Sequence, residues 1–263
     1  MTDTVLEQRD EGLLTITLNA PEQRNALSMD VALPLLAAVR RAASDRSVRA
    51  ILLEGAGTHF CVGGNVGNFG DPAKPPPSVE QRRPELREIM ETSRLLHEMP
   101  KPIIVAIQGA AAGAGLALAL ACDLRIAGEN AKLTTAFAKV GMSGDFGGSY
   151  FLTHLLGSAR ARELYLLSPI LSGREAYAIG LVTRVVPDDH VAIAAREVAL
   201  ALARGPTVTL GYIKTNIRNA ETESLATCLD TEALNQCCCL QTADQREAGA
   251  AFLQKRAPLF IGR

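Results

Sequence analysis

The chain has 263 residues, enough for one large domain or for one domain with an appendage. Hydrophobic residues make up 48% and the formal net charge is −1, so we expect a sizeable core and no basic face for nucleic acid or a membrane surface. Aromatic residues are only 4% and tryptophan is absent, which also argues against a platform on which bases stack.

The N-terminus and the cysteines indicate where the protein works. The opening "MTDTVLEQRDEG" is polar and acidic, so we expect no signal peptide. The longest apolar run, 103–122, contains Gln108 and several glycines and is better explained as a buried strand, turn and helix than as a membrane span. The six cysteines form no CxxC pair, and the adjacent 237–239 would point in different directions on a helix. We therefore expect a cytoplasmic protein with reduced thiols and no metal.

Strands and helices alternate through the first half. The pattern predicts, in chain order, strands at 4–10 and 11–20, a helix at 29–43, a strand at 48–57, a Gly- and Pro-rich loop at 58–78, a helix at 79–99, a strand at 101–109, a small-residue turn at 110–115 that leads into an apolar helix, and a strand at 123–130. Such alternation is typical of an α/β core with parallel strands.

The second half is mostly helical. From about residue 158 only 181–187 has the pattern of a strand, and the last 60 residues predict helices at 206–220, 225–241 and 243–258. This helical end is expected to be either a cap on the core or an arm for oligomerisation.

Two glycine-rich turns, "CVGGNV" (61–66) and "AAAGAG" (110–115), each follow a predicted strand. Small residues let a ligand approach the backbone, and the start of a helix offers N–H groups without partners. Two such turns on neighbouring strands could direct two N–H groups at one oxygen, as an oxyanion hole does for an enolate. The alternative is that these glycines only permit tight packing.

One acid, Asp145, stands among glycines and apolar residues in "VGMSGDFGGSYFL" (140–152). Aspartate is a favoured N-cap, and a helix is expected to begin at 146–149, so capping is one explanation. The other is that the carboxylate takes part in chemistry.

Several segments together resemble the crotonase superfamily, the enoyl-CoA hydratase/isomerase family. They are "LNAPEQRNALS", "GAGTHFCVGGNV", "KPIIVAIQGAAAGAG", "CDLRIAGENAKL", "FAKVG…GGSYFL", "LSGREAYAIGLVTRVV" and "FLQKRAPLF", and their order covers essentially the whole chain. The resemblance implies an α/β fold, the crotonase (ClpP-like) spiral of ββα repeats. It also implies a core at 1–200 with an acyl-CoA site and a C-terminal helical trimerisation region at 201–263.

The resemblance assigns residues to the site. The two oxyanion-hole amides would be those of Gly64 and Ala114, and Asn65 stands where the family usually has Asp. The residues implied in binding the acyl-CoA are Arg24, Ala26, Val62, Gly63, Asn65, Val66, Gly113, Phe137 and Val140. Phe252 and Lys255 on the last helix are expected to reach the CoA of a neighbouring subunit in a homotrimer or a hexamer built from two trimers.

The family's hydratases resemble one another in carrying two glutamates, and here those positions hold Ala117 and Phe137. Neither side chain can carry a proton, so a standard hydratase mechanism is not expected. Asp145 matches the base of the branch that contains 1,2-epoxyphenylacetyl-CoA isomerases and Δ3-Δ2 enoyl-CoA isomerases. Apolar neighbours such as Val140, Met142 and Phe146 would raise its pKa.

The resemblance leaves other activities open. Dehalogenases of 4-chlorobenzoyl-CoA use an Asp at the matching place as nucleophile, together with a His and a Trp; His97 lies too far along its helix to match, and Phe137 replaces the Trp. A hydratase-type lyase with non-standard residues and a non-catalytic acyl-CoA-binding protein are further alternatives. In each case the CoA belongs to the ligand and no separate cofactor is expected.

Overall fold

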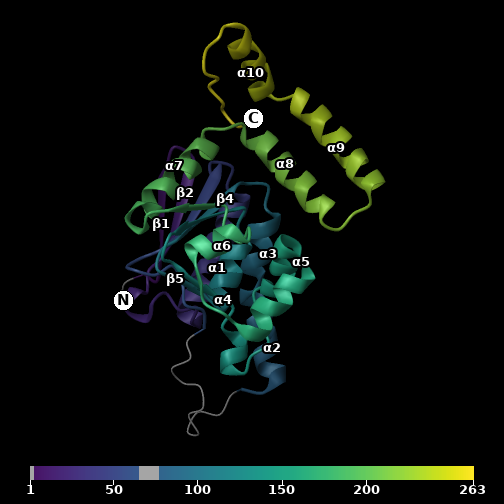
Figure 1. Cartoon of the computed structure of the whole chain (residues 1–263). Helices are drawn as coiled ribbons and strands as arrows, with labels where there is room; N and C mark the ends of the chain where they lie inside the picture. Colours follow the sequence, from purple (N-terminus) through teal and green to yellow (C-terminus); the bar gives the residue numbers. More distant parts are fainter. Residues whose placement is uncertain (1–2, 65–76) are drawn as a thin grey trace.

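The computed structural model describes residues 3–64 and 77–263, and its centre is a six-stranded sheet (Figure 1). The strand order is β1-β2-β3-β4-β6-β9; β1 and β2 are antiparallel and every other pair is parallel. The strands are β1 (Val5–Asp10), β2 (Leu13–Leu18), β3 (Ala50–Gly55), β4 (Ile103–Ile107), β6 (Leu124–Gly128) and β9 (Arg184–Val186). The predicted α/β core with parallel strands is confirmed.

The central strands are apolar on both faces because each face is covered. Successive side chains of a strand point to opposite faces. Leu14 and Ile16 therefore join a core with α1 (Met29–Ser44), while Leu13, Leu52 and Ile104 join a second core with α7 (Val191–Ala203). Burial on both faces explains why the strands are nearly continuous hydrophobic runs.

A second, three-stranded sheet lies beside the first. It consists of β5 (Ala110–Ala112), β7 (Lys132–Thr134) and β8 (Leu171–Ser172), with β5 parallel to β7 and β7 antiparallel to β8. The prediction of a turn over 110–115 is therefore partly wrong. Three alanines carry no strand signal of their own, and 110–112 become a strand by pairing with β7.

The predicted helix 79–99 is two helices, α2 (Val79–Ile89) and α3 (Glu91–Glu98). The break falls at Met90, whose ψ of −15 departs from that of an α-helix. The bend lets α3 bury Leu96 in the core while most of α2 stays exposed. A polar, charged α2 next to an amphipathic α3 looks continuous in sequence, so the break was not predicted.

Three helical segments shape the region near Asp145: α4 (Ala114–Leu120), η2 (Phe137–Val140) and α5 (Gly148–Leu167). A further helix, α6 (Gly173–Ala178), packs against β7, β8 and β9. Inside α5, Gly157 has φ 75 and ψ 160, so the chain kinks there and its second segment runs back toward its first. Two further short 3-10 helices are η1 (Pro21–Gln23) and η3 (Asp188–His190).

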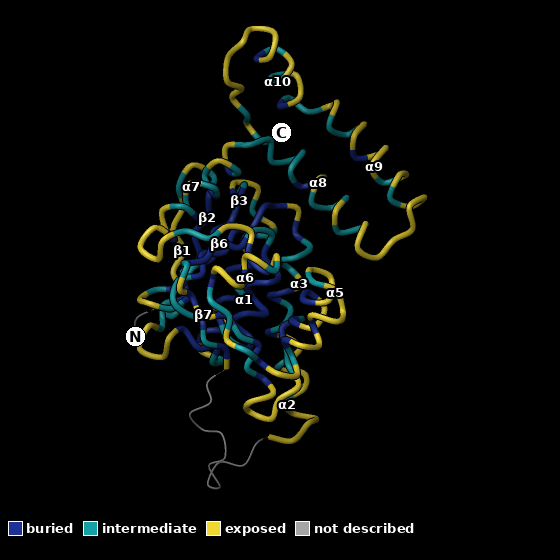
Figure 2. Tube along the Cα trace, in the orientation of Figure 1, coloured by how far each residue is buried: buried dark blue, intermediate teal, exposed yellow. Residues whose placement is uncertain are grey.

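The C-terminal helices α8 (Thr207–Ala220), α9 (Leu225–Leu240) and α10 (Ala243–Leu253) extend from one end of the molecule, as predicted (Figure 1). They are mostly exposed or half-buried, in contrast to the buried sheet (Figure 2). Exposed apolar side chains occur on them, including Ile217, Leu225 and Leu234. Such a surface is suited to contacts between subunits, and the trimer stays a prediction.

Candidate active site

The two glycine-rich turns lie side by side. Cys61 and Ala111 form a parallel bridge: the amide of Cys61 donates to Ala110 O at 3.1 Å, and the amide of Ala112 donates to Cys61 O at 3.0 Å. Because the bridge joins the beginnings of the two turns, it sets them next to each other. The predicted neighbourhood of the two segments is confirmed.

Glycine is required where the turns meet. Gly63 has φ +86, and a Cβ on it would lie 2.7 Å from Ala112 O and 3.2 Å from the Ala114 nitrogen. A Cβ on Gly115 would lie 2.3 Å from Cys61 O. The main chains therefore approach each other more closely than any side chain allows.

Two amides are available at this junction. Gly113 precedes α4 with φ 52 and ψ −125, and Ala114 is the first residue of the helix. Among the residues that the structure describes, the amides of Gly64 and Ala114 donate no hydrogen bond. A Cβ on Gly64 would meet nothing within 4 Å, so that position faces open space. Two amide donors on adjacent turns are the components of an oxyanion hole.

The loop after β2 packs against the first turn. The amide of Leu27 donates to Gly63 O at 2.7 Å, and the amide of Val62 donates to Arg24 O at 3.3 Å. Ala26, in the same loop, is buried, whereas Arg24 is exposed. Four of the predicted CoA-binding residues, Arg24, Ala26, Val62 and Gly63, are thus brought together.

Asn25 fixes this loop, and the sequence analysis did not single it out. Its side chain is fully buried, with Nδ2 donating to Ala56 O at 2.9 Å and to His59 O at 2.8 Å, and Oδ1 accepting from the amide of Ala20 at 2.9 Å. Its φ of 55 is left-handed, a conformation that Asn adopts more readily than most residues. Asparagine is common in turns with a left-handed conformation, so an Asn in the loop "PEQRNALS" is the signal that could have indicated this role.

Asp145 does not cap α5. The N-cap is Gly147, with φ 77 and no side-chain cap. Asp145 is two residues earlier, half-buried, and its Oδ1 is buried without a hydrogen-bond partner among the described residues. The capping alternative is therefore wrong, and the carboxylate needs another explanation.

Burial raises the pKa of Asp145 from 3.8 to about 6, and the positive charge of Arg82 opposes this shift. The direction agrees with the prediction from its apolar neighbours. Phe146 is 2% exposed, whereas Val140 and Met142 are exposed, so Phe146 contributes to this environment and the other two do not cover the acid. A carboxyl group with this pKa changes protonation state near neutral pH, as a general base does.

An aromatic pair lies between the two turns and the Asp145 loop. Phe137 is buried and stacks on Tyr165, with ring centroids 6.0 Å apart and an interplanar angle of 5°. A Cβ on Gly113 would lie 3.7 Å from Phe137, and one on Gly148 would lie 2.5 Å from Tyr165 Oη and 3.1 Å from Ala117 Cβ. The start of α4, the aromatic pair and the Asp145 loop therefore form one packed group. Tyr165 was missed because only the kink at Gly157 brings it here.

The remaining predicted residues do not join this group. Asn65 and Val66 lie outside the described residues. Phe252 is on α10, at the end of the molecule away from α4 (Figure 1). Lys255 was predicted on the same helix but lies two residues beyond its end. Both are exposed, so only a neighbouring subunit could bring them to a CoA, and that expectation stays a prediction.

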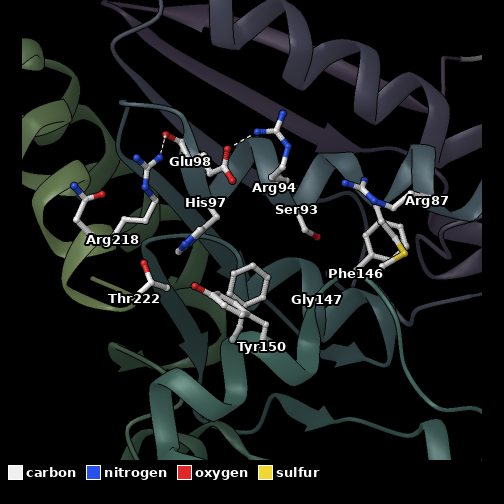
Figure 3. A pocket seen from close by; sticks show the side chains of 13 residues that line it. Arg87, Ser93, Arg94, His97, Glu98, Phe146, Gly147, Tyr150, Arg218 and Thr222 are labelled. Carbon is white, nitrogen blue, oxygen red and sulfur yellow. Dashed lines mark hydrogen bonds and ion pairs between the residues drawn. The ribbon is translucent and has the colours of Figure 1, made fainter. Parts of the chain in front are cut away.

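A cavity lies on the other side of the Asp145 loop, between α3, α5 and α8 (Figure 3). Phe146 and Gly147 form part of its wall, and His97 and Tyr150 face each other across it. The Nε2 of His97 makes no hydrogen bond with the described residues, and burial lowers the pKa of His97. The cavity thus presents imidazole and aromatic surface, with Glu221 Oε2 3.4 Å from His97 Nε2.

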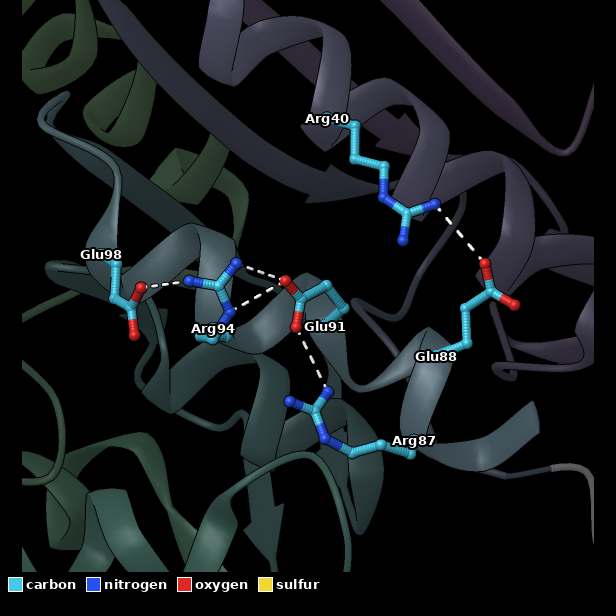
Figure 4. A network of polar contacts seen from close by, with 6 residues as sticks. All are labelled: Arg40, Arg87, Glu88, Glu91, Arg94 and Glu98. Carbon is cyan, nitrogen blue, oxygen red and sulfur yellow. Dashed lines mark hydrogen bonds and ion pairs between the residues drawn. The ribbon is translucent and has the colours of Figure 1, made fainter. Parts of the chain in front are cut away.

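Two of the arginines that line this cavity form ion pairs with carboxylates (Figure 4), and a third, Arg218, donates only to the backbone oxygen of Glu98 at 3.3 Å. Arg94 forms ion pairs with Glu91 and Glu98, and Arg87 pairs with Glu91 at 3.2 Å. The guanidinium of Arg94 lowers the pKa of Glu91 to about 2. Carboxylates therefore neutralise Arg87 and Arg94, whereas Arg218 has no carboxylate partner among the described residues.

The comparison with known families decides the class of the protein. Residues 8–263 match the model of the enoyl-CoA hydratase/isomerase family. The chain belongs to this family. A crystal structure of an enoyl-CoA hydratase from Polaromonas sp. JS666 has a TM-score of 0.90 and 31% identity, with 98% of this chain and 99% of that chain covered. The crotonase fold is thereby confirmed.

Relatives within the family carry names of different reactions. The 1,2-epoxyphenylacetyl-CoA isomerase of Escherichia coli K12 is 39% identical over the full length of both chains. A 4-chlorobenzoyl coenzyme A dehalogenase-2 of Arthrobacter sp. is 32% identical and covers 87% of this chain and 82% of its own. Membership therefore identifies the scaffold, and the residues of the site must distinguish the reaction.

In the described part of the chain, no group of three or more His, Cys, Asp or Glu side chains could hold a metal ion, and no helix combines the length and hydrophobicity of a membrane span.

Proposed function

We propose that this protein is an enoyl-CoA isomerase, or a ring-opening or ring-expanding isomerase, that acts on an acyl-CoA thioester. Asp145 removes a proton from one carbon of the acyl chain and returns it to another on the same face. The electron pair left by the proton moves into the thioester carbonyl and produces an enolate. When the electron pair returns from the enolate oxygen and Asp145 gives the proton to the other carbon, the double bond has shifted and the isomerisation is complete.

The amides of Gly64 and Ala114 stabilise the enolate oxygen in this proposal. Charge develops on that oxygen as the proton leaves, so two fixed N–H donors lower the barrier without having to reorient. Both are main-chain groups held by the bridge between Cys61 and Ala111. The loop with Arg24, Ala26 and Val62 would bind the CoA through backbone and shape, and no cofactor beyond the substrate's CoA is needed.

One observation carries the choice of isomerase over hydratase. Asp145 has a buried carboxylate oxygen with no hydrogen-bond partner among the described residues, beside the packed group at the start of α4, whereas Ala117 and Phe137 supply no carboxylate there. A single carboxylate suffices for moving one proton between two carbons. Hydration is usually supported by two, one for the water and one for the α-proton. The full-length likeness to an isomerase supports the same choice.

The test is the Asp145→Asn variant, which keeps the size of the side chain and removes the base. We expect isomerisation of a 3-enoyl-CoA and exchange of α-deuterium to be lost, and binding of the thioester, measured by isothermal titration calorimetry, to be kept. The matched control is Asp30→Asn on the exposed side of α1, which should turn over like the natural protein.

Other outcomes would identify other reactions. Unchanged isomerisation in Asp145→Asn contradicts the assignment of the base. Chloride release from 4-chlorobenzoyl-CoA would favour the dehalogenase alternative, and hydration of a 2-enoyl-CoA without isomerisation would favour a lyase. Binding without deuterium exchange in the natural protein would indicate an acyl-CoA-binding protein that has no catalytic activity.

The assembly belongs to the same proposal. We propose a homotrimer, or a hexamer of two trimers, in which Phe252 and Lys255 of one subunit approach the CoA of the next. The exposed position of both residues on the C-terminal arm supports this arrangement. Sedimentation of the purified protein measures the mass of the assembly directly.

A further inference from the structure

Tyr165 lies against the loop that carries Asp145, although twenty residues separate them in the chain. The kink at Gly157 turns the second segment of α5 back along the first. As a result the phenol ring packs between η2 and the start of α5, stacked on Phe137. Nothing in the isomerase proposal above uses this residue.

The glycines on both sides of Asp145 leave space for this phenol. A Cβ on Gly144 would lie 2.9 Å from Tyr165 Cε1 and 3.2 Å from Oη, and one on Gly148 would lie 2.5 Å from Oη. The hydroxyl therefore sits where two side chains have been omitted, one residue before and three residues after Asp145. In the described residues, Asp145 Oδ1 is buried without a hydrogen-bond partner, and burial and the charge of Asp145 both raise the pKa of the Tyr165 hydroxyl.

Among the described residues, few other groups near Asp145 could donate a hydrogen bond to its carboxylate. Ala117 from α4 and Phe137 from η2 have no donor, and Phe146 fills the side of the loop. From α2, Arg82 contributes a positive charge, but its guanidinium contacts Glu85 at 3.2 Å and is 44% exposed. In the part of the chain that the structure describes, Tyr165 is a further titratable group close enough for the charge of Asp145 to raise its pKa.

Tyr165 keeps its proton at any working pH. Burial, together with the negative charge of Asp145, raises the pKa of Tyr165 to about 12. Its hydroxyl can therefore donate to a carboxylate and does not compete with Asp145 as a base.

Resting on the isomerase proposal, we infer that Tyr165 is a positioning residue for Asp145, whose hydroxyl donates a hydrogen bond to the ionised carboxylate during the reaction and holds it toward the acyl chain. Hydrogen bonds of catalytic groups often form only in the complex with substrate, which accounts for the carboxylate oxygen without a partner among the described residues. The stack on Phe137 fixes the ring, so little freedom is lost when the bond forms.

The experiment is the pH dependence of kcat for the Tyr165→Phe variant, which removes only the hydroxyl. A donor stabilises the ionised carboxylate, so its loss should raise the apparent pKa of the acidic limb by about one unit and lower the plateau kcat about tenfold. KM should not change. Tyr177→Phe, on the exposed face of α6, is the matched control and should keep the natural profile.

A second measurement does not depend on turnover. The infrared carbonyl band of protonated Asp145, identified by its disappearance in Asp145→Asn, can be titrated in Tyr165→Phe with a bound non-reactive acyl-CoA. A midpoint that moves upward supports the inference, and an unchanged midpoint overturns it, even if the variant is inactive. If Asp145→Asn is inactive and Tyr165→Phe keeps the natural profile, the positioning role alone fails. If Asp145→Asn stays active, the isomerase proposal fails, and the band titration still decides the contact.

Discussion

Asn25 Nδ2 donates to the carbonyl oxygen of His59 at 2.8 Å and so ties the loop after β2 to the segment that leads into Cys61 and Gly63. The same amide group also reaches Ala56 O, and the side-chain oxygen receives the Ala20 amide. One buried side chain therefore joins three pieces of backbone. The shape of the proposed CoA site depends on it.

Asn25→Ala should remove all three bonds and leave buried backbone groups without partners. We expect a loss of about 3 kcal/mol in the free energy of unfolding, measured by urea denaturation. We also expect weaker binding of CoA thioesters in calorimetry, because Val62 and Arg24 lose their common support. The comparison is Asn19→Ala. Asn19 directly follows β2, and its side chain donates only to Asp3 O among the described residues, so this change should lower the free energy of unfolding much less. Equal effects of the two changes would contradict the special role of Asn25.

Gly113→Ala should impair the proposed oxyanion hole. There is space for the methyl group, whose nearest contact would be 3.7 Å, but φ 52 with ψ −125 is accessible almost only to glycine. The backbone would rotate and carry the Ala114 amide away, and loss of one such donor typically lowers kcat by about 10² to 10³. Steady-state kinetics on a 3-enoyl-CoA measures this effect.

The control for this change is Gly249→Ala inside α10, where a Cβ meets nothing within 4 Å. Alanine favours a helix over glycine, so we expect unchanged kcat and a gain of about 0.5–1 kcal/mol in stability. A normal kcat in Gly113→Ala would show that the Ala114 amide does not serve the reaction.

The pKa of Asp145 predicts the pH dependence of the natural enzyme. A base must be ionised, so kcat/KM should rise with pH through about 6 and then level off. Initial rates between pH 5 and 8 measure this limb. A profile that is flat over this range contradicts Asp145 as the base.

The same group should affect stability with a definite sign. Because the folded-state pKa of Asp145 is raised, the folded protein binds the proton more tightly, and stability is lost as pH rises from about 4 to about 6. Asp145→Asn removes this loss. We expect the variant to be more stable than the natural protein by about 2 kcal/mol at pH 7 and to lose that advantage near pH 4, as denaturation at a series of pH values will show.

The pKa of Asp45 is shifted in the opposite direction, so its effect on stability should have the opposite sign. Hydrogen bonds from Ser47 lower its pKa to about 2, with Arg9 adding to the effect. Asp45→Asn should therefore be less stable than the natural protein above about pH 4, and the difference should fade as pH drops toward 2. If both Asn variants shift stability in the same direction, the environments inferred for the two acids are wrong.

Local patterns were sufficient to predict most of the fold. The apolar runs at β2, β3 and β4 identify strands buried on both faces, and the glycines at 63, 113 and 115 identify the turns. The bend at Met90 and the strand at 110–112 escaped prediction, since tertiary packing rather than local preference decides them.

The site followed the same division. The two glycine-rich turns could be found because backbone conformation leaves a mark in sequence, whereas the resemblance assigned the roles of Gly64 and Ala114 within them, and those roles stay predictions. Tyr165 could not, because a single residue with positive φ, Gly157, reverses the direction of α5 and brings distant positions together. Asn25 has an effect over similarly long range through hydrogen bonds to Ala56 and His59.

The bridge between Cys61 and Ala111 is made entirely of main-chain atoms, and this has a consequence for how such a site can diversify. Side chains that face the turns can be exchanged without breaking this bridge, because its hydrogen bonds join backbone atoms only. The proposed oxyanion hole thus belongs to the scaffold, whereas the proposed acid-base group is a side chain that can be exchanged by itself. A laboratory effort to change the reaction should leave the turns alone and vary the residues that face them from η2 and α5.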